Sequence, residues 1–172
     1  MPVISSSNPY CMTSIGSFAS FKAGWKWSGD FGDRTSAPTT VSGDSLFNSS
    51  GFNYDDSGWS TIDVETGGTG GGDQYYGYCR KKFFYLKGDY TFSGNSDDEA
   101  CWGLVPSGSA GTIIQGNIAT VSGAGTQSFT NHSFTVSTSG VYYLTGRLIE
   151  GGGGDHIKLT AHSNLNSVFV AP

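Results

Sequence analysis

Two adjacent aspartates, Asp97 and Asp98, stand in the middle of a strand-like stretch, YTFSGNSDDEACWGLV, at residues 90–105. Neighbouring carboxylates can form a proton-transfer pair, hold a metal ion, accept sugar hydroxyls, or make a polar turn that bonds local backbone N–H groups. The residue types alone leave these four alternatives open. The same choice applies to Asp55-Asp56, where the following Ser-Gly favours a turn.

We do not expect catalysis by these carboxylates. A glycosidase needs two carboxyl groups about 5 to 10 Å apart in a cleft. Asp97 with Asp155 or Glu150 could supply such a pair, but the chain is small, only 13% charged, and has no insertion that would build a deep cleft. The Gly-x-Ser-x-Gly turn that presents a nucleophilic serine is also absent. We therefore predict that the protein is not an enzyme.

Aromatic residues offer a second kind of chemistry, because exposed rings beside glycine-rich loops can stack on sugar faces. Trp25 and Trp27 share one face of an extended segment, with Lys26 on the other. Any one of these rings more often packs in a core or on a sheet face than binds a sugar. The candidate ligand-binding rings are Trp25, Trp27, Tyr75, Tyr76 and Trp102.

Composition indicates an all-β protein. The 172 residues include 27 glycines and 14% aromatics, which together with many serines and threonines suit short strands joined by tight turns. A net charge of −5 and the lack of a basic stripe argue against nucleic-acid binding. No apolar run approaches membrane-spanning length, so we predict no membrane insertion. The three cysteines, Cys11, Cys79 and Cys101, allow at most one disulfide and do not have zinc-site spacing.

Strand-like segments recur about every ten residues, which predicts an antiparallel β-sandwich or barrel. We divide the chain into an irregular N-terminal arm, 1–24, which holds one candidate first strand, and a single β-sandwich domain, 25–172. The expected strands lie within 59–64, 75–86, 88–96, 99–105, 112–114, 118–121 and 166–172, and residues 127–162 are expected to form a strand, a turn, a strand, a glycine loop and a strand. A glycine-rich segment at 66–74 is predicted to be a loop, and it lacks the Lys-Ser/Thr of a phosphate-binding loop.

Two blocks of the sequence resemble the PA14 and GLEYA-type β-sandwich domains. GDYTFSGNSDDEACWGLV at 88–105 has their Gly-x-Tyr-x-Phe strand and Ser-Asp-Asp turn, and TVSTSGVYYLTGRLIEGGGGDHIKLTA at 135–161 has their Gly-x-Tyr-Tyr strand and Glu/Gly-rich loop. Upstream, YDDSGWSTIDV at 54–64 and YYGYCRKKFF at 75–84 resemble galactose-binding jelly-roll modules. One departure is PSGSAG at 106–111, where PA14 domains often carry an Asp-Gly turn.

The resemblance implies a calcium site, because sugar-binding PA14-like domains use paired aspartates to hold an ion that coordinates sugar hydroxyls. Asp97 and Asp98 match that pair. Adjacent residues of a strand point to opposite faces, so both reach one ion only if the backbone is kinked, for example by a cis peptide. Asp155, beside four glycines, and Asn95 are the further candidate ligands. A plain turn with no ion stays the alternative.

These features together predict a non-enzymatic surface-recognition protein. It would bind a cell-surface glycan or dock to other virion structural proteins, as one of several symmetric copies. The segment MPVISSSNPYCMTS lacks a basic region followed by an apolar stretch, so we expect no signal peptide and a virion location, for example a bacteriophage tail or capsid accessory. Three alternatives stay open: an extracellular protein, a purely structural decoration or adaptor protein, and an accessory carbohydrate-binding domain of a glycoside hydrolase system.

Overall fold

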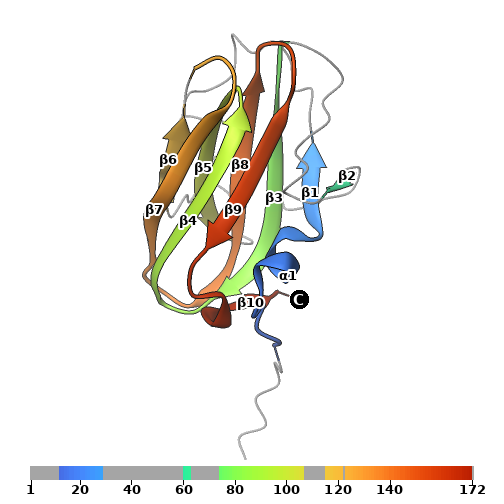
Figure 1. Ribbon diagram of the computed structural model, residues 1–172. Helices are drawn as coiled ribbons and strands as arrows, with labels where there is room; N and C mark the ends of the chain where they lie inside the picture. The colour runs from blue at the N-terminus through green and yellow to red at the C-terminus, as the bar shows by residue number, and fades with distance from the viewer. Residues whose placement is uncertain (1–11, 29–59, 63–73, 107–114, 122, 172) are drawn as a thin grey trace, which may run out of the picture.

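The structure is an all-β sandwich of two packed antiparallel sheets, which confirms the predicted fold class (Figure 1). It is a computed structural model that describes residues 12–28, 60–62, 74–106, 115–121 and 123–171. No helix in these described ranges is long and apolar enough to cross a membrane.

The larger sheet has seven strands in the order β2-β1-β3-β8-β5-β6, with β10 also pairing with β3. Its centre is the pair β3 and β8, which stay in register over eleven residues. Strands β1 and β10 share the other edge of β3, β1 at residues 78–80 and β10 at 83–85. The strands are β1 (Trp25–Ser28), β2 (Ser60–Ile62), β3 (Tyr75–Tyr85), β5 (Glu99–Pro106), β6 (Gln115–Val121), β8 (Gly140–Glu150) and β10 (Val168–Val170).

The smaller sheet has three strands in the order β7-β4-β9, namely β7 (Gln127–Val136), β4 (Gly88–Asp97) and β9 (His156–His162). A bulge in the middle of β4 shifts its register with both neighbours. Gly94 sits at this bulge, where a Cβ atom would press on the Lys158 carbonyl oxygen and lie 2.6 Å from Phe129 Cζ. The close approach of three strands therefore requires glycine at this position.

Strand prediction from the sequence was accurate in the described part of the chain, with β2 inside the expected 59–64 segment and β10 inside 166–172. The expected strand at 112–114, the Asp55-Asp56 turn and most of the 66–74 loop lie outside the described residues.

The sequence predicted an irregular arm at residues 1–24 with one candidate strand, but its described part contains a short helix. Residues Phe18–Lys22 form a short helix, α1, capped by the Ser17 side chain, which accepts a hydrogen bond from Ser20 N at 3.2 Å. The fully buried Phe21 belongs to the main core. The helix packs against the sandwich through Phe21. The serine-rich composition of this segment favoured an irregular arm, but Ser17 caps a short helix here.

The core between the sheets is made largely of aromatic side chains, which alternate inward along each strand. His162, at the end of β9, is buried among them, with its ring 4.6 Å from that of Phe21. Its Nε2 lies 3.3 Å from Tyr85 Oη and its Nδ1 2.7 Å from the Ser163 carbonyl oxygen. A short 3-10 helix, η2 (Leu165–Ser167), follows and leads into β10.

Burial lowers the pKa of His162 to about 4, against a bond to the Ser163 carbonyl that raises it. The unfolded chain, with a pKa of 6.5, therefore binds more protons between these values, so stability falls as pH drops from 6.5 towards 4. The difference of 2.5 pKa units corresponds to a loss of about 3 kcal/mol. Urea unfolding at several pH values should show this loss in wild type and a smaller one in His162→Gln. If the free energy of unfolding fell equally with pH in wild type and in His162→Gln, His162 would not be the group responsible.

Candidate functional site

Asp97 and Asp98 lie at the corner where the chain passes from one sheet to the other. Strand β4 ends at Asp97 in the three-stranded sheet, and β5 begins at Glu99 in the seven-stranded sheet. The peptide bond between the two aspartates is cis. The segment is therefore a crossover between sheets and differs from a plain turn that joins two paired strands.

The buried Asp98 carboxylate connects this corner to two loops that are distant in sequence. Its Oδ1 accepts a hydrogen bond from Gly125 N, between β6 and β7, at 2.6 Å. Its Oδ2 accepts one from Gly151 N, between β8 and β9, at 2.8 Å. The Asp98 carbonyl oxygen accepts a further bond from Ser96 Oγ at 2.9 Å. Asp98 thus holds three chain segments together at one end of the sandwich.

Glu150, the last residue of β8, lies beside this carboxylate and is only 1% exposed. Its Oε1 accepts a hydrogen bond from Gly152 N at 2.5 Å. Its Oε2 is buried and has no hydrogen-bond partner in the described part of the chain. Burial raises the pKa of Glu150, and the negative charges of Asp98, Asp97 and Asp155 raise it further, against the Gly152 N–H, which lowers it.

Asp155, at the end of the glycine loop, completes the group. Its Oδ2 accepts a hydrogen bond from the hydroxyl of Tyr75, the first residue of β3, at 2.5 Å. Asp97 lies opposite His156 in the β4–β9 register. Burial and the Lys158 charge lower the pKa of His156, while the Asp97 and Asp155 carboxylates raise it.

We call these four carboxylates, Asp97, Asp98, Glu150 and Asp155, the acidic corner. Figure 1 shows why they meet: β4 and β8 end, and β3, β5 and β9 begin, at the same end of the sandwich, opposite α1 and β10. Sequence reasoning brought Asp97, Asp98 and Asp155 together but considered Glu150 only as an unlikely catalytic partner. The signal for Glu150 was its position directly before four glycines at the end of a strand.

No group of three or more His, Cys, Asp or Glu side chains in the described residues lies close enough to hold a metal ion. An ion at the acidic corner would therefore also need backbone carbonyl oxygens of the glycine loop and water. The donor chemistry fits a hard cation, because Glu150 Oε2 is a buried acceptor without a donor. Asn95, half-buried on β4 opposite Ser128 and Lys158, is not among the hydrogen-bonded groups of the corner.

The candidate sugar-stacking rings need correction. Trp25 and Trp102 are fully buried and pack edge to face with ring centres 5.9 Å apart. Trp27 and Tyr75 are 6% and 3% exposed and belong to the same core. A stacking role is incompatible with this burial, because aromatic residues in an alternating strand are drawn inward when the sheet faces a core. Tyr76, half-buried against Tyr78, is the one candidate left partly exposed.

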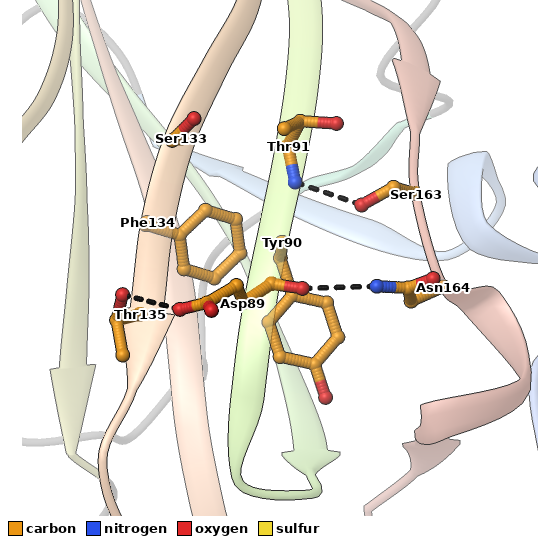
Figure 2. A pocket seen from close by; sticks show the side chains of 8 residues that line it. All are labelled: Asp89, Tyr90, Thr91, Ser133, Phe134, Thr135, Ser163 and Asn164. Atoms are coloured by element: carbon orange, nitrogen blue, oxygen red, sulfur yellow. Dashed lines mark hydrogen bonds between the residues drawn. The ribbon is translucent and has the colours of Figure 1, made fainter.

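A separate hollow of about 500 Å³ crosses β7, β4 and the segment after β9 (Figure 2). Asp89 is central to it: its Oδ1 accepts from Thr135 Oγ1 at 2.6 Å, and its carbonyl oxygen accepts from Asn164 Nδ2 at 2.9 Å. Thr91 N donates to Ser163 Oγ at 2.8 Å. The groove offers hydroxyl and carboxylate groups, but the rings of Tyr90 and Phe134 beneath it are buried.

Comparison with known proteins gives a structural similarity and no family. No family model matches the chain, and no curated protein matches it. Among solved structures, it is similar to the one titled "Crystal structure of PA14 domain of MpAFP Antifreeze protein". The identity is 17% and the TM-score 0.37, over 87% of this chain and 68% of the other. The fold class of the chain rests on the two sheets described above.

Replacing Asp98 by alanine should destabilise the protein even without any ion, since two backbone N–H groups lose a charged acceptor. Such bonds contribute about 1.5 to 3 kcal/mol each, so we expect a loss of about 3 to 6 kcal/mol for the two. Urea unfolding in the presence of a chelator measures it. Asp89→Ala, at an exposed carboxylate on the same strand, should change stability by only about 0.5 kcal/mol. Equal effects of the two substitutions would contradict the role assigned to Asp98.

Proposed function

We propose that the acidic corner binds a calcium ion and that the protein is a non-enzymatic recognition module that binds glycans through this site. The observation that carries the proposal is the buried Oε2 of Glu150, which lacks a hydrogen-bond donor in the described residues and lies near three other carboxylates. A buried carboxylate is stable when a cation or donors compensate its charge. A bound divalent cation would supply that compensation.

The ligand set we propose is centred on Glu150 Oε2 and the Asp97 carboxylate, and backbone carbonyl oxygens and water complete it, since no three described carboxylates lie close enough to share an ion. The loop at 152–154 adds backbone carbonyl oxygens, whereas the Gly151 carbonyl oxygen already accepts a hydrogen bond from Gln74 Nε2. Gly154 lies close to Asp97, since a Cβ there would be 3.8 Å from Oδ2. All of these donors are oxygens, which calcium prefers at a coordination number of about six to eight. Asn95 from the sequence prediction is replaced by Glu150 in this set.

The position of the acidic corner supports glycan binding. The ion would lie where several loops end, so water on its outer side can be exchanged for a pair of sugar hydroxyls. A role in holding an ion fits the hydrogen bonds better than proton transfer does, because both oxygens of Asp98 already accept backbone N–H groups.

The virion setting, the multi-copy assembly and the alternative of a purely structural protein rest on sequence composition, and they stay predictions. The accessory carbohydrate-binding role within a glycoside hydrolase system is a special case of the same proposal.

Calcium should raise the melting temperature by several degrees relative to a chelator, because a ligand that binds only the folded state stabilises it. Glu150→Gln and Asp97→Asn should abolish this difference while they remain folded. Asp89→Asn, which removes one charge from the groove of Figure 2, should keep the calcium-dependent rise in melting temperature. A chain whose melting temperature is the same with calcium and with EGTA would refute the ion site.

A glycan array with the fluorescently labelled chain tests the second half of the proposal. Binding should appear with calcium, disappear with EGTA, and be lost in Glu150→Gln. Binding that survives EGTA but is lost in Asp89→Asn would place glycan recognition in the groove of Figure 2. The absence of any bound glycan, together with a normal calcium response, would favour the structural alternative.

A further inference from the structure

Two arginines are buried on the face of the seven-stranded sheet that points away from the aromatic core. Along β3 and β8, alternate residues such as Cys79 and Leu144 belong to the core cluster, whereas Arg80 and Arg147 lie on the opposite face. Each arginine is only 1% exposed. Such burial is rare for arginine unless its charge is compensated.

Arg147 lies near the centre of this face. Its register neighbours are Tyr78 on β3 and Cys101 on β5, and both are fully buried. Neither its Nε nor its Nη1 has a hydrogen-bond partner in the part of the chain that the structure describes. The guanidinium group stays protonated at any physiological pH, so these are permanent, buried, positively charged donors.

Thr145 adds a third donor to the same place. It stands two residues before Arg147 on the same face of β8, is fully buried, and its hydroxyl also lacks a partner among the described residues. Arg80 is directly opposite Thr145 in the register and contributes a second positive charge. Its guanidinium carbon lies 4.6 Å from the centre of the Tyr143 ring, which holds it on this face.

Arg147 and Thr145 therefore present three buried donors on one face that lack acceptors among the described residues. We propose that Arg147 and Thr145, with the charge of Arg80 beside them, bind a small oxyanion of the sulfate, phosphate or carboxylate type. An oxyanion accepts several N–H and O–H bonds at once and neutralises the guanidinium charge, the arrangement for which arginine is preferred in proteins. A neutral ligand would leave the buried charge uncompensated.

The site is separate from the acidic corner. Glu150 follows Arg147 by three residues on the same strand, and the alternation of the strand directs the two side chains to opposite faces of the sheet. The ligands are also of opposite charge. The oxyanion site therefore adds to the proposed function and does not depend on it.

Thermal unfolding of the full chain, in sodium sulfate and in sodium chloride of equal ionic strength, tests the proposal. Sulfate at millimolar concentration should raise the melting temperature by several degrees and then saturate, because binding to the folded state stabilises it. Arg147→Met should show no saturable response. Lys87→Met, which removes the same charge from an exposed position on the turn before β4, should respond like wild type. Sodium phosphate and sodium acetate series identify the preferred oxyanion.

A second variant keeps the test decisive if Arg147→Met does not fold. Thr145→Val preserves the shape of the side chain and removes its hydroxyl, so about tenfold more of the preferred oxyanion should be needed for half the stabilisation. Glu150→Gln should leave this response unchanged while losing the calcium response. Equal responses to all three oxyanions in wild type and in Arg147→Met, or a response that never saturates, would overturn the proposal, because general salting-out acts on any surface.

Discussion

The loop end of this sandwich depends on one buried carboxylate. Asp98 accepts a backbone N–H from Gly125 with one oxygen and from Gly151 with the other, so a single side chain fixes the β4–β5 corner against two loops. Bonds from neutral amides to a charged acceptor are among the stronger ones in proteins. They position the start of the glycine loop, and with it Glu150 and Asp155, close to Asp97.

That arrangement has an electrostatic cost. Burial and the three neighbouring carboxylates raise the pKa of Glu150, which shows that the folded protein disfavours its negative charge. A cation in the corner would reverse this balance, because it converts repulsion among the carboxylates into shared attraction. The rest of the fold, with its fully buried aromatic core, is rigid enough to hold such like charges together. The proposed calcium site and the proposed recognition surface both follow from this constraint.

The fold was more predictable from the sequence than the site was. Alternating residues in stretches such as 75–85 determine strands locally, so the expected 75–86 strand matches β3 nearly to the residue, and the strand expected early in 140–162 is β8. Whether a tryptophan faces a core or a ligand depends on which strands pack together, so Trp25 and Trp102 were misplaced as binding residues. Glu150 and Arg147 gain their significance from unpaired buried atoms, and those arise from packing that a sequence pattern does not encode. Asp97 and Asp98 were recognised because they are adjacent in the chain.

The most direct measurement is the number of calcium ions that each chain binds at equilibrium. Dialysis of the full chain against micromolar calcium, followed by metal analysis of protein and buffer, gives this number without reference to stability or to a glycan. We expect one ion per wild-type chain, one in Asp89→Asn, and none in Glu150→Gln or Asp97→Asn. No bound calcium in wild type, or one ion retained in Glu150→Gln, would contradict the assignment of the acidic corner as the ion site.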